Sequence, residues 1–233
     1  MIDADNIDGD LFFYNLTRNS NDFSMLPVFE LDRIAQKIRN ILKKHGSRKD
    51  IILNHRELQE AFFSPFKPQL KNAQVFLSHS HADKKKALEV KDYLENQTKR
   101  KVFVDSLFWD YKDDVLNELA KYDDISRIKD AFTLILRESL QDMIEKCPYF
   151  VFLQSKNSVS FNQDLLKITY SAWIYEELKI ANTFIADTAL QESHIKAMRV
   201  SYDVTNLLRR FKPISLDSLC KKIAPNLITK DTK

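Results

Sequence analysis

The pattern of this chain is set by one segment, Val75-Phe76-Leu77-Ser78-His79-Ser80-His81-Ala82-Asp83, where an apolar run opens into hydroxyl and imidazole side chains. A short apolar run of this kind is typical of a strand that is buried on both faces. Two similar runs follow, Lys101-Val102-Phe103-Val104-Asp105 and Tyr149-Phe150-Val151-Phe152-Leu153. Because segments with helical spacing separate the runs, we predict an α/β fold with a parallel sheet and helices on both faces.

Apolar residues at helical spacing predict the helices between and after these strands. The predicted helices are Asp83–Asn96, a segment around Val115–Leu119, Ile128–Lys146, Ser171–Ile185, and a final helix capped by Ser215. We also expect Asp83 to cap the first of them and a long connection to follow Asp105. A further strand fits Met198–Val204, but clear fourth and fifth strands of a parallel sheet are missing after Thr183.

The first part of the chain is expected to be a separate extension. Apolar residues recur at helical spacing from Leu31 to Leu42, and Gly46 follows as a C-terminal cap. The segment Ser64-Pro65-Phe66-Lys67-Pro68 is typical of a linker because prolines interrupt regular structure. We therefore predict an N-terminal extension with one amphipathic helix over residues 1–70 and an α/β domain over residues 71–233.

Composition excludes several classes of protein. A near balance of 36 basic and 33 acidic residues does not favour a nucleic-acid partner. The chain has only two glycines, Gly9 and Gly46. It therefore lacks the glycine-rich phosphate-binding loops of P-loop and dinucleotide-binding proteins. Cys147 and Cys220 are expected to be buried free thiols. No signal peptide or membrane-spanning run is found, so we expect a cytoplasmic protein without a membrane partner.

Polar side chains follow all three predicted strands. Ser78, His79, Ser80 and His81 come after the first, Asp105 after the second and Gln154-Ser155 after the third. Parallel sheets bind ligands beyond the carboxyl ends of their strands. We therefore expect the functional site at this edge.

One interpretation of the first loop is a zinc hydrolase, because His79, His81 and Asp83 form a His-x-His-x-Asp pattern. Such a site needs a closed shell of three or four ligands. Lys84 stands where a further histidine is usual, and only His194 remains downstream. The sequence therefore disfavours a metal centre, and no metal is expected.

The segment Ser171-Ala172-Trp173-Ile174-Tyr175-Glu176-Glu177-Leu178 leads to another interpretation. It resembles the Ser-x-Trp-Cys-x-x-Glu-Leu signature of Toll/interleukin-1 receptor (TIR) domains, with Ile174 in place of the cysteine. The run Phe76-Leu77-Ser78-His79-Ser80 resembles the first TIR strand and loop, and Val102–Asp105 resembles the second TIR strand. These motifs come in the TIR order over about residues 73–225, so the resemblance implies the flavodoxin-like TIR fold.

Many TIR domains, especially bacterial ones, cleave the nicotinamide–ribose bond of NAD. The resemblance thus implies an NAD glycohydrolase, a cyclase or an ADP-ribosyl transferase of antiviral defence, with NAD as substrate and no cofactor. By the same resemblance Glu177 is the catalytic residue. Trp173, one helical turn away, would stack on the base or on nicotinamide, and Phe76 would add a second aromatic wall.

The resemblance assigns the remaining site residues to substrate binding. Ser78, His79 and Ser80 would line the pocket, and Asp105 would support the ribose or the following loop. Trp109 and Asp110 would lie in the equivalent of the TIR BB loop, which helps to complete the site across a protomer interface. Self-association through TIR–TIR contacts and a downstream effector that recognises the nucleotide product are therefore implied partners.

Two alternatives remain open. The chain could be a non-catalytic TIR module that recruits partners through TIR–TIR contacts. It could also be a related nucleoside-processing enzyme on a similar sheet. The pair of Trp173 and Glu177 favours an NAD-consuming enzyme over the scaffold, because a scaffold does not need a carboxylate that faces a pocket.

Overall fold

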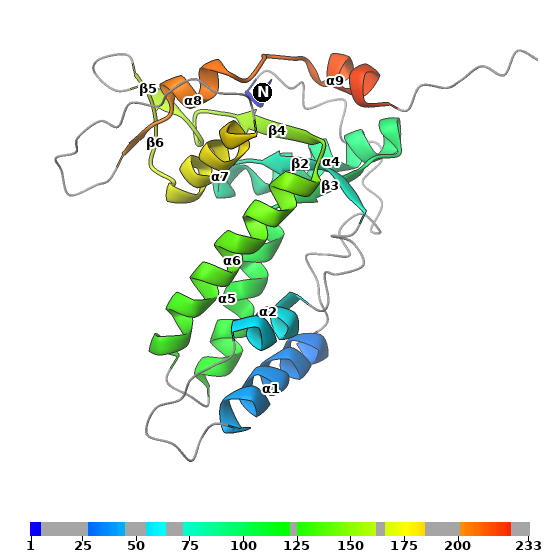
Figure 1. The fold of residues 1–233 in the computed structure, drawn as a ribbon. Helices are drawn as coiled ribbons and strands as arrows, with labels where there is room; N and C mark the ends of the chain where they lie inside the picture. The colour runs from blue at the N-terminus through cyan, green and yellow to red at the C-terminus, as the bar shows by residue number, and fades with distance from the viewer. Residues whose placement is uncertain are drawn as a thin grey trace, which may run out of the picture.

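The structure, a computed structural model, describes residues 1–5, 28–44, 55–63, 72–121, 125–161, 166–184 and 201–224. Its centre is a four-stranded parallel sheet flanked by helices, with a small antiparallel sheet beside it (Figure 1). The predicted α/β class and the parallel sheet are therefore confirmed.

The parallel sheet has the strand order β1-β4-β2-β3. Its strands are β1 (Ile2–Asp3), β2 (Ala73–Ser78), β3 (Lys101–Val104) and β4 (Tyr149–Gln154). The chain leaves β2 toward one side of the sheet and returns to the other, so that β2 lies between β3 and β4. The carboxyl end of β2 is therefore at the point where the strand order reverses, which is where open parallel sheets bind ligands.

Alternation along β2 divides the core into two layers. Val75 and Leu77 pack toward α4 (Lys84–Thr98) and α9 (Leu216–Ile223). Phe76 packs on the other face, where it joins a cluster with α6 (Ser126–Lys146), α7 (Ala172–Thr183) and α8 (Thr205–Arg209). Since successive side chains of a strand point to opposite faces, Ser78 shares the face of Phe76.

A helical arm extends away from the sheet. It consists of α1 (Val28–Lys44), α2 (His55–Phe63), α5 (Ser106–Ala120) and the beginning of α6, below the sheet in Figure 1. Its core adjoins one sheet layer through Phe103 of β3 and includes the fully buried side chains of Ile38, Leu119 and Phe132. The predicted extension therefore contains a second helix, α2, that the sequence pattern did not reveal.

The N-terminal residues do not remain in that extension. Strand β1 pairs in parallel with β4, Ile2 opposite Leu153 and Asp3 opposite Gln154. Ile2 is 2% exposed and Ala4 is 0% exposed. Residues from the predicted 1–70 segment thus complete the sheet of the predicted 71–233 domain, at the edge where a fourth strand was missing from the sequence pattern.

The connection after Asp105 differs from its prediction. The helix expected around Val115–Leu119 is present as α5, but it begins at Ser106, so the long loop expected directly after Asp105 is wrong. Trp109 and Asp110 lie within this helix and not in a loop equivalent to the TIR BB loop. The apolar spacing of Val115, Leu116 and Leu119 was recognised, but it marks only the second half of a helix that starts two residues after the end of the strand, at Ser106.

The other predicted elements agree with the structure. The strands at 74–77, 101–105 and 149–153 are β2, β3 and β4, and the helices at 83–96, 128–146 and 171–185 are α4, α6 and α7. The final helix is α9, and Ser215 caps it by accepting a hydrogen bond from the Ser218 amide. Both cysteines are buried free thiols, as predicted. Gly46 and the Ser64–Pro68 segment lie outside the described residues.

A small antiparallel sheet contains the remaining strands. These are β5 (Ser160–Phe161), β6 (Lys167–Thr169) and β7 (Tyr202–Asp203), in the order β5-β6-β7. Strand β7 falls within the predicted strand at 198–204, but it does not extend the parallel sheet.

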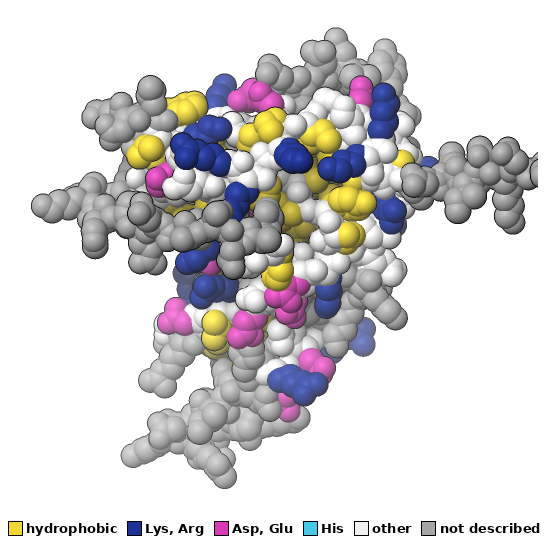
Figure 2. Space-filling model, turned by 45° about the horizontal axis from the view of Figure 1, so that its top comes forward, with side chains coloured by type: hydrophobic (Ala, Val, Ile, Leu, Met, Phe, Trp, Pro, Cys, Tyr) yellow, Lys and Arg dark blue, Asp and Glu magenta, His cyan; other side chains and the backbone are white. Residues whose placement is uncertain are grey.

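On the face brought forward in Figure 2, lysine and arginine side chains are spread among hydrophobic ones over the upper half, and acidic side chains lie near its edge and, mixed with further basic ones, in the lower half. Helices α8 and α9 and their connection contribute basic side chains from Arg209, Arg210, Lys212, Lys221 and Lys222 to the surface of the molecule. Within the part of the chain that the structure describes, no helix has the length and apolar character needed to cross a membrane.

Candidate functional site

The site begins at the carboxyl end of β2. Ser78 is the last residue of the strand and is 0% exposed, and His79 directly after it is 3% exposed. The apolar run Val75–Leu77 anchors the strand in both core layers, so the chain carries two polar side chains into the interior where the strand ends. Buried polar groups are costly unless they have partners, and both residues have one.

Helix α7 supplies the partner of Ser78. Its first turn is fixed by Ser171, whose side chain accepts a hydrogen bond from the Ile174 amide. Ile174 and Leu178 are buried against the sheet. This packing turns Glu177 inward, where the Ser78 hydroxyl donates a hydrogen bond to Glu177 Oε2. The carboxyl group of Glu177 is therefore held directly over the end of the central strand.

Strand β3 supplies the partner of His79. Asp105 follows the strand and is 6% exposed. Its Oδ1 lies 2.9 Å from His79 Nδ1, with side-chain exposures of 8% and 0% respectively. Because Ser78 and His79 are consecutive, the two carboxyl groups that they contact, Glu177 and Asp105, are brought to the same buried region at the end of β2. Four side chains predicted for the site, Ser78, His79, Asp105 and Glu177, thus form one buried cluster, which we call the carboxyl cluster.

The electrostatics of the carboxyl cluster are dominated by burial. Burial raises the pKa of Glu177 well above its usual range, and the negative charge and hydrogen bond of Asp105 raise this pKa further. The hydrogen bond from Ser78 acts in the opposite direction and lowers it. Two carboxyl groups in contact cannot both be ionised at low cost, so Glu177 holds a proton under conditions in which an ordinary glutamate is charged.

Ser106 is a member of this region that the sequence did not reveal. It opens α5 next to Asp105 and is 2% exposed, and its Oγ has no hydrogen-bond partner among the described residues. The same holds for Nε2 of His79. Buried polar atoms without partners are rare in native proteins and are found at functional sites. The only sequence signal for Ser106 was its place after a strand that ends in a carboxylate.

Three other predicted site residues, Phe76, Trp173 and Ser80, lie outside the carboxyl cluster. Phe76 is fully buried in the core, stacked on Phe150 with ring centroids 5.5 Å apart. Trp173 is half-buried and packs against the same core layer, one turn from Glu177. Ser80 is half-buried, and its carbonyl accepts a hydrogen bond from the Asp83 amide. The side chain of Trp109 lies outside the described part of the chain.

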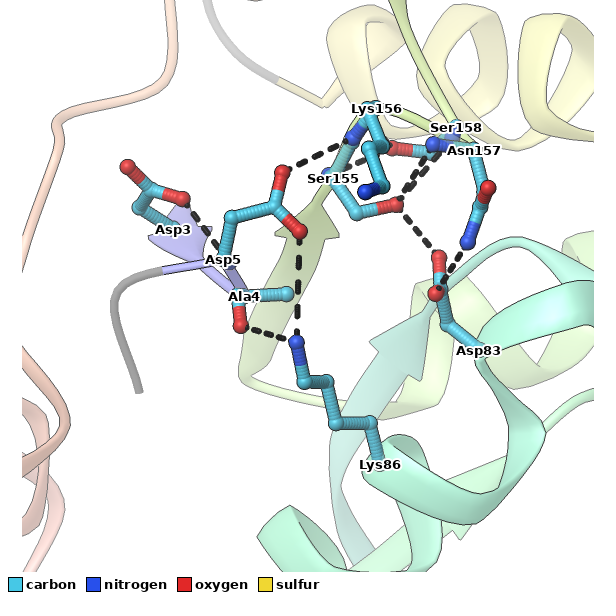
Figure 3. Close-up of polar contacts among 9 residues, drawn as sticks. All are labelled: Asp3, Ala4, Asp5, Asp83, Lys86, Ser155, Lys156, Asn157 and Ser158. Carbon is cyan, nitrogen blue, oxygen red and sulfur yellow. Dashed lines mark hydrogen bonds and ion pairs between the residues drawn. The ribbon is translucent and has the colours of Figure 1, made fainter. Parts of the chain in front are cut away.

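A second polar cluster lies at the carboxyl ends of β1 and β4. Figure 3 shows the carboxylate of Asp83 pointing toward the loop after β4, where it accepts hydrogen bonds from the Ser155 hydroxyl and, at 2.7 Å, from Asn157 Nδ2. The predicted capping role of Asp83 is therefore wrong, because its side chain makes no capping bond to α4. The carboxylate joins two loops instead.

The same figure shows how the N-terminal strand is attached. Lys86 of α4 points toward β1 and donates a hydrogen bond to the Ala4 carbonyl, and Asp5 Oδ2 accepts one from the Lys156 amide at 3.0 Å. The polar groups of this cluster form hydrogen bonds with one another. These bonds join β1, α4 and the loop after β4, and we call the cluster the clasp.

The three residues of the His-x-His-x-Asp pattern do not converge. His79 faces Asp105, His81 is exposed, and Asp83 contacts Ser155 and Asn157. Among the residues that the structure describes, no group of three or more His, Cys, Asp and Glu side chains is arranged to hold a metal ion.

The carboxyl cluster can do two things chemically. It can hold one proton between two carboxyl groups, as acid–base sites do. In its ionised form, Glu177 can also stabilise a positive charge that develops next to it, as carboxylates do in glycosidic cleavage. Comparison of the chain with protein-family models, with curated proteins and with solved structures found no match.

Proposed function

We propose that this chain is a TIR-like enzyme that cleaves the nicotinamide–ribose bond of NAD. The observation that carries the proposal is the hydrogen bond between Ser78 and Glu177, residues 99 positions apart, at the carboxyl end of the central strand. Both residues belong to motifs that resemble TIR signatures, and both lie where a parallel α/β sheet binds ligands.

A single carboxylate is sufficient for this reaction. In NAD the nicotinamide is a cationic ring, and it departs from the ribose as a neutral molecule. Its departure therefore requires no general acid. The ribose that remains is oxocarbenium-like, as in glycoside cleavage. An ionised Glu177 beside the ribose would stabilise that charge, which makes Glu177 the catalytic residue of the proposal.

Trp173 is proposed to bind the substrate from the same helix. Residues four positions apart lie on one helical face, so an aromatic ring and a carboxylate can contact one ligand. Ser78 would contact the ribose together with Glu177. Because Glu177 is 0% exposed, the substrate must bind to a conformation in which the carboxyl cluster is opened.

The biological setting of the proposal follows the TIR resemblance. The product would be ADP-ribose, a cyclic isomer or a conjugate, and it would signal to a downstream effector of bacterial antiviral defence. Self-association through TIR–TIR contacts would accompany the active form. In the flavodoxin-like TIR arrangement, β1 would occupy the position of the fourth strand.

Nicotinamide release from NAD at high protein concentration tests the proposal, with Glu177→Gln as the inactive variant. Glutamine keeps the shape and hydrogen bonds of a neutral carboxyl group but cannot ionise. Glu176→Gln is the matched control, because Glu176 is next in sequence and pairs on the surface with Arg137 at 3.2 Å. We expect release by the wild type and by Glu176→Gln, and a loss of about 100-fold or more in Glu177→Gln.

Mass spectrometry of the products then distinguishes hydrolase, cyclase and transferase. Release that survives Glu177→Gln would remove Glu177 from the catalytic role. Absence of release by the wild type, also under conditions that promote self-association, would contradict an NAD-consuming enzyme.

A non-catalytic TIR-like interaction module is the second proposal, and the full burial of Glu177 favours it. A carboxyl group without exposed surface can have a purely structural role, as a hydrogen-bond partner inside the core. Exposed aromatic side chains at the small sheet and the end of α7 offer contact area for a partner: Phe161, Tyr170 and Phe184 are 64%, 62% and 54% exposed. This module would self-associate equally well as wild type and as Glu177→Gln, which light scattering can measure. A screen of nucleosides in place of NAD tests the third possibility, a nucleoside-processing enzyme.

A further inference from the structure

We propose that Asp105 and His79 are positioning residues that act on Glu177 and do not bind the substrate: Asp105 accepts the hydrogen bond of the protonated Glu177 carboxyl group, and His79 fixes Asp105 in place. This inference rests on the proposed function for its catalytic meaning. Its structural part concerns only where the proton of the carboxyl cluster resides.

The geometry brings the two carboxyl groups to the same end of β2 from different elements. Asp105 follows β3 and lies against His79, whereas Glu177 projects from α7 and accepts a hydrogen bond from Ser78. With both groups buried, one of them must carry a proton, because two adjacent carboxylates repel strongly where water is excluded.

The surroundings decide which carboxyl group is protonated. Asp105 has an imidazole nitrogen 2.9 Å from its Oδ1, which stabilises a negative charge there. Glu177 is the more deeply buried of the two, at 0% against 6% exposed. The proton therefore resides on Glu177, and the charge resides on Asp105.

The charged side chains on α6, α7 and next to α8 that could face Glu177 have contacts elsewhere. From α6, Arg137 pairs with Glu176 on the surface, and the buried α6 side chains in this core layer are apolar. From α7, Lys179 is exposed and lies over the ring of Tyr175. From the region of α8, Arg210 donates to the Asn182 carbonyl.

The consequence is that Asp105 sets the pH range in which Glu177 is available as a carboxylate. A protonated Glu177 cannot stabilise an oxocarbenium-like ribose, so the enzyme would lose activity as the pH falls below the pKa of Glu177. Removal of the Asp105 charge should shift that limit to lower pH.

The direct test follows the side-chain carboxyl carbon of Glu177 by ¹³C NMR as a function of pH, without substrate. The signal is assigned by its absence in Glu177→Gln. We expect Asp105→Asn to lower the pKa of Glu177 by about 1 unit or more, because asparagine removes the repulsion and can donate a hydrogen bond. His79→Asn should lower it too, because Asp105 would then compete for the proton. This second variant keeps the test decisive if Asp105→Asn does not fold.

Asp83→Asn is the matched control. Like Asp105, Asp83 is a buried carboxylate, with 8% of its surface exposed, and it lies in the segment after β2. Its hydrogen bonds join it to Ser155 and Asn157 and not to Glu177. Its substitution should leave the Glu177 titration unchanged. An unchanged titration in both Asp105→Asn and His79→Asn, or an equal shift in Asp83→Asn, would overturn the proposal.

The pH profile of nicotinamide release separates this inference from the proposed function. In an active enzyme, the acid limb of kcat/KM should move to lower pH in Asp105→Asn together with the NMR titration. A shifted titration without any nicotinamide release would contradict the proposed function and leave the proton assignment intact. Nicotinamide release by Asp105→Asn with an unshifted Glu177 titration and an unshifted acid limb would overturn the positioning role. The proposed cleavage of NAD would then still stand.

Discussion

Glu177 shows how the interior of this protein treats a single ionisable side chain. The residue has no exposed surface, its Oε2 accepts a hydrogen bond from Ser78, and the negative charge of Asp105 adds to burial in raising the pKa of its carboxyl group. A buried carboxyl group is tolerated in its neutral form, and ionisation in this environment is costly. The residue that the proposed reaction requires as an anion is thus one that the folded state prefers to keep neutral.

This preference makes the stability of the protein depend on pH. The pKa of Glu177 is raised in the folded state, whereas the unfolded chain has an ordinary pKa of about 4.3. Below that value both states are protonated. As the pH rises above it, the unfolded state loses its proton first, so the free energy of unfolding falls until the pH passes the folded-state pKa.

We therefore expect Glu177→Gln to be at least as stable as the wild type at neutral pH. Its advantage should begin near pH 4.3 and grow by about 1.4 kcal/mol for each unit by which folding raises the pKa of Glu177. Urea unfolding at a series of pH values measures it, with Glu176→Gln as the control. A difference between Glu177→Gln and the wild type that does not change with pH would show that Glu177 titrates normally.

At the same scale, sequence alone found much of the carboxyl cluster. Ser78, His79 and Asp105 were identifiable because each follows an apolar run, whereas Glu177 was identified only through the resemblance of Ser171–Leu178 to the TIR signature. Their mutual contacts were not predictable, since they depend on how α7 packs over the sheet. Phe76 was expected to wall a pocket, but strand alternation places it in the core against Phe150.

Among the elements, β1 is one of the shortest and the least expected. It has two paired residues, so no periodicity can be recognised in it. Its attachment has two parts of different strength. Ile2 and Ala4 are buried in a core layer, whereas the ion pair between Asp5 and Lys86 is long, at 3.9 Å, and half-exposed.

We expect the buried part to dominate. Ile2→Ala should lower the free energy of unfolding by about 2–5 kcal/mol, because it leaves a cavity beside Leu153. Asp5→Asn should cost about 1 kcal/mol or less, since an exposed ion pair is weak and asparagine can still accept from the Lys156 amide. Urea unfolding of both variants measures the difference. Equal effects would mean that the clasp, and not the core, holds β1.

Helix α5 shows a different limit of the sequence pattern. Its second half has clear apolar spacing, with Val115 and Leu119 buried. Its first turn contains buried Ser106 beside Asp105, and such polar residues after a strand are as typical of a loop as of a helix start. The expected long connection was wrong because tertiary packing of the arm, and not local spacing, decides where α5 begins.

On the scale of the whole molecule, the arm and the sheet share their helices. Helices α5 and α6 contribute to the arm core through Leu119 and Phe132, while α6 also covers the sheet through Leu140 and Met143. Helices α1 and α2 cover the arm side of this pair. A boundary near residue 70 separates segments of sequence, but it does not separate hydrophobic cores.

A chain shortened to residues 72–233 should therefore fail to fold as a compact monomer. It would lose β1 from the sheet and the cover of the arm core from α1 and α2, which exposes apolar side chains such as Val115 and Ile135. Size-exclusion chromatography, dye binding to apolar surface and near-ultraviolet circular dichroism compare it with the full chain. Cooperative unfolding of a monomeric 72–233 chain would show that the boundary is a true domain boundary.

The pairing of Ile2 with Leu153 has a consequence for synthesis. A ribosome adds about 5–20 residues per second, so on the order of ten seconds separates the two residues during translation. In that interval Ile2 and Asp3 are without the strand that completes their hydrogen bonds. Strand β1 is thus made well before β4, and it can join the sheet only after about 150 further residues have been added.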